Sequence, residues 1–158
     1  MKKLSLLILI MALGIFAGKT VSAQEFKAND VLGIWLNEDK DAQINIYQEG
    51  DNYFGKIVWL KNPIDEETGK PKTDDENPDE SLRNTPTLGL IILKDFEFDE
   101  DEWNDGTIYD PKSGKTYSCY MIFPDGKEKL KIRGYILGIS FLGRTSYWTK
   151  EKEQNKMN

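Results

Sequence analysis

The chain has 158 residues, a formal net charge of −6, one cysteine and no histidine. That length is enough for one domain with a sizeable core. Without histidine the chain has no Ser-His-Asp or Cys-His catalytic set and no histidine-bound zinc. Its single cysteine, Cys119, allows no internal disulfide. The acidic balance argues against nucleic acid and anionic membrane surfaces as partners.

Residues 1–23 have the pattern of a secretory signal peptide. Two lysines at positions 2 and 3 precede an apolar run, Leu4 to Ala17, and Val21-Ser22-Ala23 is a small-x-small cleavage signal. A membrane anchor is the alternative, but this run of about 14 residues is shorter than the roughly 20 that span a bilayer. We therefore expect cleavage after Ala23, export to the periplasm or the extracellular space, and no integral membrane segment after processing. The remaining chain, which loses three lysines and no acid, has a net charge of −9.

From residue 28 onward, short apolar and aromatic runs alternate with turn signals. Residues 28–31 are expected to form one helical turn. A period of two places Ala42, Ile44 and Ile46 on one face, as in a strand with one buried side. Strands are predicted for residues 33–36, 42–48, 53–60, 88–98, 103–109, 116–123, 129–135 and 139–148. Within the fifth of these, Asp105-Gly106 indicates a bulge.

The stretch from residue 106 to residue 150 shows this organisation best. Asp110-Pro111-Lys112-Ser113-Gly114 and Pro124-Asp125-Gly126 are turn sequences, because proline and aspartate favour the turn and glycine supplies its positive φ. Strands joined by such short turns are antiparallel neighbours. We therefore predict an all-β domain over residues 24–150, an antiparallel up-and-down meander of about eight strands. A flexible tail, residues 151–158, is expected to follow it.

The segment from Lys61 to Arg83 departs from the strand pattern. It is polar and acidic, with three prolines, and it is long for a connection between strands, so it is either functional or mobile. Near its end Asn77 is expected to cap one short helical turn that begins at Pro78. Asp75, Asn77 and Asp79 also have the spacing of calcium ligands, but the glycine and the bidentate acid of a calcium loop are missing.

An open sandwich and a closed barrel both accommodate eight antiparallel strands. Gly33-x-Trp35 lies on the first predicted strand and Arg144 on the last, and in a closed barrel these strands are neighbours. An arginine stacked on the Trp35 indole would close one end of the barrel. This pairing resembles the lipocalin signature. It favours the barrel and assigns roles in barrel closure to Gly33, Trp35, Arg144 and Trp148.

A longer series of motifs supports a family resemblance. The series includes Gly55-Lys56-Ile57-Val58-Trp59-Leu60, Asp75-x-Asn77-Pro78-Asp79, Gly106-x-Ile108-Tyr109-Asp110-Pro111, Arg133-Gly134-Tyr135 and Gly143-Arg144-Thr145. In order and spacing these motifs resemble the bacterial family called domain of unknown function 2147, from Val31 to Lys150. The resemblance implies a small exported protein with a lipocalin-like barrel and no established activity.

The candidate ligand site is centred on Arg133, which shares a strand face with Lys131 and Tyr135. One interpretation is a solvated outer face. In the other, Arg133 lies at the barrel mouth with Tyr109 and Tyr117, pairs an acidic ligand or the acids of residues 75–80, and the long segment acts as a lid. The predicted ligand-binding residues are Arg133, Tyr109, Tyr117, Tyr135, Arg83, Asn77 and Asp79. We assign no catalytic residue, metal ligand or cofactor.

Three functions remain open from the sequence, in this order. The first is an exported binding protein for a small, partly apolar molecule, favoured by the predicted barrel and the aromatic content. The second is a protein-interaction module with a filled barrel. The third is a cell-envelope hydrolase that uses two carboxylates, for which Asp75, Asp79 and Asp110 are available. Cys119, in a strand-like run, is expected to be a buried, inert thiol.

Overall fold

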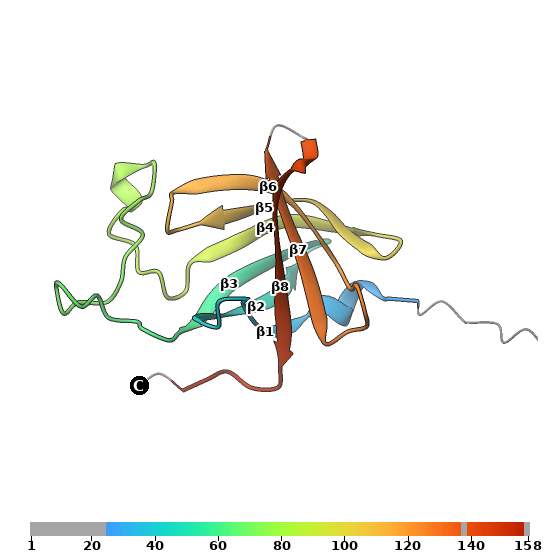
Figure 1. Ribbon diagram of the computed structural model, residues 1–158, viewed down its shortest axis with the longest axis horizontal. Coiled ribbons are helices and arrows are strands. Elements are labelled where there is room, and N and C mark those ends of the chain that lie inside the picture. Colours follow the sequence, from blue (N-terminus) through green and yellow to red (C-terminus); the bar gives the residue numbers. More distant parts are fainter. Residues whose placement is uncertain (1–24, 137–138, 157–158) are drawn as a thin grey trace, which may run out of the picture.

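The computed structural model describes residues 25–136 and 139–156 (Figure 1). The predicted signal peptide and its cleavage site therefore lie outside the described residues. Two short 3-10 turns are present, η1 (Ala28–Val31) and η2 (Glu80–Leu82). The strands are β1 (Gly33–Leu36), β2 (Ala42–Glu49), β3 (Asn52–Leu60), β4 (Ile91–Asp99), β5 (Glu102–Asp110), β6 (Lys115–Ile122), β7 (Lys129–Ile136) and β8 (Ile139–Glu151).

These strands form a closed barrel in chain order, and every neighbouring pair is antiparallel. The barrel closes between β1 and β8, where Trp35 lies opposite Lys150. The predicted eight-stranded up-and-down barrel is thus confirmed, as is the short helical turn in the long loop. The predicted bulge is present too, because the register between β5 and β6 shifts between Trp103 and Gly106. A Cβ atom at Gly106 would run into the Phe96 ring, so glycine is needed there.

One end of the barrel, which we call the closed end, is covered by η1. Each residue of η1 accepts a hydrogen bond from a barrel side chain. The four donors are Trp103 Nε1 to the Ala28 carbonyl (3.1 Å), Tyr53 Oη to Asn29 Oδ1 (3.1 Å), Lys150 Nζ to the Asp30 carbonyl (2.8 Å) and Trp35 Nε1 to the Val31 carbonyl (2.8 Å). Inside, the Trp103 ring lies 5.1 Å from Phe123 and 5.0 Å from Phe98, between ring centroids. The closed end is therefore solid and its donors are satisfied.

Barrel closure uses a different cation from the one predicted. Lys150 Nζ lies 5.0 Å from the centre of the Trp35 ring, and Gly33 lies beside the Lys150 side chain. Arg144 is paired with Gly134, further back along β8. The predicted Arg144–Trp35 pair is therefore corrected to a Lys150–Trp35 pair, because the β1–β8 register places Lys150 opposite the indole. Trp148 is buried opposite Leu130.

Residues 152–156, which we call the C-terminal strap, lie against the outer faces of β2 and β3. Gln43 is 0% exposed. Its side chain donates to the Glu153 carbonyl (3.4 Å) and accepts from the Asn155 backbone N–H (2.6 Å). Trp59 Nε1 donates to the Lys156 carbonyl (3.0 Å). The strap thus has specific partners, and the predicted flexibility of residues 151–158 stays a prediction.

Cys119 lies on the inner face of β6 and is fully buried as a free thiol. Burial raises the pKa of Cys119 to about 12, so the thiolate is not populated at neutral pH. The prediction of a buried thiol is confirmed.

Candidate functional site: a groove on the barrel wall

The long loop between β3 and β4, residues 61–90, is folded back along the barrel and extends beyond its edge (Figure 1). Its two arms are joined by backbone hydrogen bonds from Asp74 N to the Thr85 carbonyl and from Thr87 N to the Lys72 carbonyl, each 2.9 Å. The Gly89 N–H donates to the Ile57 carbonyl (2.8 Å) and attaches the loop to β3. Because Gly89 takes part in this attachment, β4 begins at Ile91, later than predicted.

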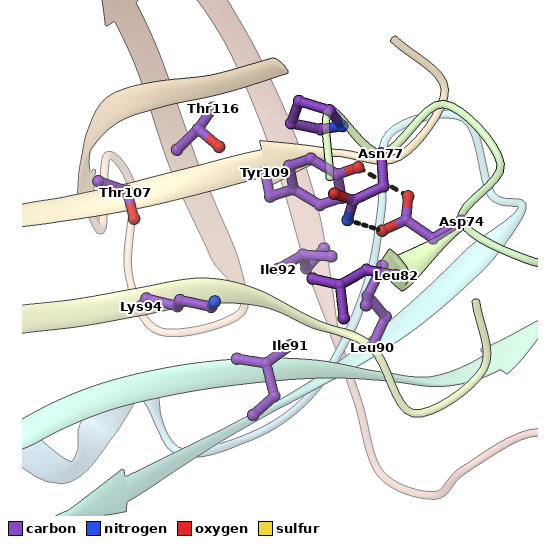
Figure 2. Close-up of a pocket in the computed structure, with 11 residues that line it drawn as sticks. Asp74, Asn77, Leu82, Leu90, Ile91, Ile92, Lys94, Thr107, Tyr109 and Thr116 are labelled. Carbon is purple, nitrogen blue, oxygen red and sulfur yellow. Dashed lines mark hydrogen bonds between the residues drawn. The ribbon is translucent and has the colours of Figure 1, made fainter. Parts of the chain in front are cut away.

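A groove of about 240 Å³ lies between this loop and the barrel wall (Figure 2). We call it the lateral groove. Its lining residues are Asp74, Asn77, Pro78, Leu82, Leu90, Ile91, Ile92, Lys94, Thr107, Tyr109 and Thr116. Four aliphatic side chains supply most of its apolar surface, while hydroxyl groups and one ammonium group come from the strands.

The lateral groove is on the outside of the barrel. Residues that lie opposite one another on antiparallel strands share a face. Leu93, Ile108 and Tyr117 form one such row, and its buried Leu93 belongs to the core. The polar groove residues of the strands alternate with this row, since Lys94 lies opposite Thr107 and Tyr109 lies opposite Thr116. They therefore point outward, toward the long loop.

Asp74 fixes one end of the groove. Its carboxylate is buried, since the residue is 0% exposed, and accepts two hydrogen bonds, from Tyr109 Oη to Oδ1 (2.7 Å) and from Asn77 Nδ2 to Oδ2 (2.6 Å). Burial, the hydrogen bond to Asp74 and the negative charges nearby raise the pKa of Tyr109 to about 12. The Tyr109 hydroxyl is therefore protonated at neutral pH, and its proton points at Asp74. This contact attaches the loop to β5.

The β5–β6 turn supports the same end of the groove. Gly114 has φ +67°, and a Cβ atom there would collide with the Glu76 carbonyl oxygen. The turn and the long loop thus approach each other backbone to backbone. On its other side, Lys112 Nζ lies 2.9 Å from Asp41 Oδ2 in the β1–β2 turn. Any residue larger than glycine at position 114 would push the loop away from the turn.

The short turn η2 forms the rim of the groove, and its cap differs from the predicted one. Asp79, not Asn77, is the N-cap, and its Oδ1 accepts from Ser81 N (2.9 Å). Asn77 Oδ1 instead accepts from Asp79 N (2.9 Å), one turn earlier. The correction follows from Asp74, which holds the Asn77 amide nitrogen and so directs its oxygen away from η2. Arg83 Nε donates to the Asn77 carbonyl (2.9 Å).

The structure separates the predicted ligand-binding residues into three groups. Asn77, Asp79, Arg83 and Tyr109 lie in or beside the lateral groove. Tyr117 points into the barrel, since it lies opposite Ile108. Arg133 and Tyr135 are on the outer face of β7, where Arg133 Nη1 donates to Thr145 Oγ1 (3.0 Å).

The expected cluster of Arg133, Tyr109 and Tyr117 at the barrel mouth is therefore not formed. The single-residue offset that pairs Tyr109 with Thr116 sends Tyr109 and Tyr117 to opposite faces. Arg133 is on the outer face as well, opposite Tyr120. The sequence reasoning missed Asp74, Lys94, Thr107 and Thr116. The alternation of Thr107 with Ile108 was a usable signal for an outward row.

Metal-binding and membrane-spanning features are absent from the part of the chain that the structure describes. Within residues 25–136 and 139–156, no cluster of three or more histidine, cysteine or acidic side chains is arranged to hold a metal ion. In the same residues, no helix is long and apolar enough to cross a membrane.

Comparison with known proteins gives a family and a fold. The profile of a family described as an uncharacterized protein conserved in bacteria, DUF2147, matches residues 33–150. A solved structure, protein HP1028 from the human pathogen Helicobacter pylori, is described as belonging to the lipocalin family. It is similar to this chain with a TM-score of 0.66 and 19% sequence identity, over 78% of this chain and 84% of that one. None of the curated proteins compared with the chain matches it.

Proposed function

The chain belongs to the bacterial DUF2147 family and folds as a lipocalin-like barrel, and from this premise we propose that it is an exported binding protein for a small, partly apolar molecule of the cell envelope. We place the bound molecule in the lateral groove. The observation that carries the proposal is the lining of that groove. Four aliphatic side chains are accessible to a ligand beside hydroxyl groups and an ammonium group. Pockets with a mainly apolar lining and a few placed polar groups are typical of small-molecule sites.

The size of the groove restricts the ligand. Its volume of about 240 Å³ is slightly below the roughly 300–1,000 Å³ of pockets for drug-sized molecules. The closed end is filled by aromatic side chains, which leaves no room for a ligand between Trp103 and Phe123. The ligand is therefore the size of a metabolite rather than of a long-chain lipid.

A protein-interaction module is the second candidate, and the surface around the groove favours it. Leu82, Leu88 and Ile91 are 48%, 41% and 38% exposed there. Exposed aliphatic side chains grouped in this way also suit a protein partner. The hydrolase has less support. Hydrogen bonds from Ser81 hold the pKa of Asp79 below its usual value, whereas a general acid needs a raised pKa.

The test is native mass spectrometry of the protein purified from its own cell envelope, before and after extraction with organic solvent. Thr107→Trp fills the lateral groove. Thr149→Trp makes the same change on β8, opposite Leu36 and far from the groove, and is the matched control. A defined mass that is lost on extraction, present with Thr149→Trp and absent with Thr107→Trp supports the proposal. A mass retained by Thr107→Trp contradicts the groove, and a bare polypeptide in all samples favours the interaction module.

A further inference from the structure

The two ends of the lateral groove differ in hydrogen-bonding character. At one end the Tyr109 hydroxyl donates its only proton to Asp74 Oδ1 (2.7 Å). A hydroxyl that has donated its proton offers only lone pairs to other groups. A ligand atom beside this oxygen must therefore carry a proton of its own, as an ammonium, an amide N–H or a hydroxyl does.

The other polar groups at this end have the same bias. The Asn77 amide nitrogen is committed to Asp74 Oδ2 (2.6 Å), and its oxygen accepts from Asp79 N (2.9 Å). No ion pair within residues 25–136 and 139–156 neutralises the buried Asp74. Asp75 and Asp110 add negative charge close to the Tyr109 hydroxyl. The potential at this end therefore favours a cation and repels a carboxylate.

The opposite end of the groove is positive. Lys94 lies across from Thr107 in the β4–β5 register. In the part of the chain that the structure describes, Lys94 has no hydrogen bond or ion pair. Figure 2 shows Lys94 and Asp74 on opposite sides of the groove, with Ile92 and Leu90 between them. An ammonium group with an adjacent hydroxyl is suited to a ligand carboxylate.

We infer that the lateral groove selects a zwitterionic small molecule, with its ammonium group at Tyr109, its carboxylate at Lys94 and a short apolar body over the aliphatic side chains between them. This inference rests on the proposed function and adds the charge and polarity of the ligand. Thr107 and Tyr109 are two residues apart on one face of β5, a spacing of about 7 Å that matches an aliphatic spacer of about five carbons. A suitable probe is therefore 6-aminohexanoate.

The experiment is isothermal titration calorimetry with three probes, 6-aminohexanoate, hexanoate and hexylamine. The wild type is expected to bind 6-aminohexanoate about tenfold more tightly than either singly charged probe, because each charged hydrogen bond adds selectivity. Lys94→Gln is expected to remove the preference over hexylamine. Lys115→Gln changes a lysine that does not line the groove and is the matched control.

A second variant tests the Tyr109 end without removing a ring or a hydroxyl. In Asp74→Asn, the new amide nitrogen can donate to the Tyr109 oxygen, so the tyrosine proton becomes free to point into the groove. We expect this variant to bind hexanoate more tightly than the wild type does and to lose its preference for 6-aminohexanoate. Circular dichroism confirms that the barrel is folded before the titration.

The outcomes separate the inference from the proposed function. If hexanoate or hexylamine binds the wild type as tightly as 6-aminohexanoate, and Thr107→Trp abolishes that binding, the zwitterion inference is overturned and the groove remains a ligand site. If binding is unchanged by Thr107→Trp, both the inference and the groove are overturned. If no probe binds, the inference is overturned, and the mass of the envelope-derived protein decides the proposed function independently.

Discussion

The closed end and the lateral groove are two regions of one barrel that use polar groups in opposite ways. At the closed end, Trp35, Trp103 and Lys150 donate to the carbonyl oxygens of η1, and the rings are buried in the core. At the groove, Asp74 and Tyr109 are paired, but Lys94 and several aliphatic side chains line open space. A fully satisfied region stabilises the fold, whereas a region with unused groups and accessible apolar surface can bind.

The difference comes from the connections at each end. The closed end has tight hairpin turns, such as those at Gly50 and Gly126, and the short turn η1 fits over the core. The opposite end has the long loop, residues 61–90, which turns outward along the wall. A loop that packs on a wall buries its anchor, Asp74, and leaves a space beside it.

The largest expected effect is at the closed end. Trp103→Ala removes a fully buried indole and its hydrogen bond to Ala28, and is expected to lower the free energy of unfolding by about 3–5 kcal/mol. The matched change in the groove region, Leu82→Ala, removes a side chain that is 48% exposed and should cost less than about 0.5 kcal/mol. Urea unfolding followed by circular dichroism measures both, and equal losses would break the comparison.

An intermediate effect is expected at the barrel closure. Lys150→Met keeps the apolar stem but removes the ammonium over Trp35 and the hydrogen bond to the Asp30 carbonyl, a loss of about 1–2 kcal/mol. Arg144→Met should change the free energy of unfolding by less than about 0.5 kcal/mol, because Arg144 is an exposed residue far from Trp35. A larger loss for Arg144→Met than for Lys150→Met would restore the arginine as the closing residue.

The smallest effect is a pH dependence at the groove. The folded protein raises the pKa of Tyr109 to about 12 from an ordinary value of 10.0. Above about pH 10 the unfolded chain releases this proton while the folded chain retains it, so the contribution to stability is complete below about pH 10 and is lost as the pH rises toward about 12. Tyr109→Phe should therefore lose less stability than the wild type between about pH 10 and about pH 12.

That comparison is made by thermal unfolding in matched high-pH buffers. Tyr53 also has a raised pKa, from burial, and it is present in both proteins, so the difference between them isolates Tyr109. Tyr120→Phe, on the outer face of β6, is the control and should follow the wild type. Parallel stability curves for Tyr109→Phe and the wild type would contradict the hydrogen bond to Asp74.

The strands and their order were predictable because their signals are local. Alternation placed Ala42, Ile44 and Ile46 on one face, and all three are buried. Short turns fixed the antiparallel neighbours. Barrel closure was harder, because both Lys150 and Arg144 lie on β8 and only the register with β1 decides which of them meets Trp35. Register between the first and last strands is a long-range property that local sequence does not contain.

The site was only partly predictable for a related reason. Asp74 and Asp75 are neighbours in an acidic run, yet Asp74 is buried and Asp75 is exposed. The choice depends on how the long loop lies on β5, which brings Tyr109 to Asp74. Gln43 shows the same limit, since its polar position in an alternating strand predicts exposure, while the C-terminal strap buries it.

The C-terminal strap also has a spectroscopic consequence. Trp35, Trp103 and Trp148 are buried in the barrel, whereas Trp59 is on the outer face and donates its indole N–H to the Lys156 carbonyl. The emission of Trp59 therefore depends on whether the strap is in place. No tryptophan is among the described residues that line the lateral groove. The difference in fluorescence between the wild type and Trp59→Phe would thus report detachment of the strap while the barrel stays folded, and it would be insensitive to a ligand in the groove.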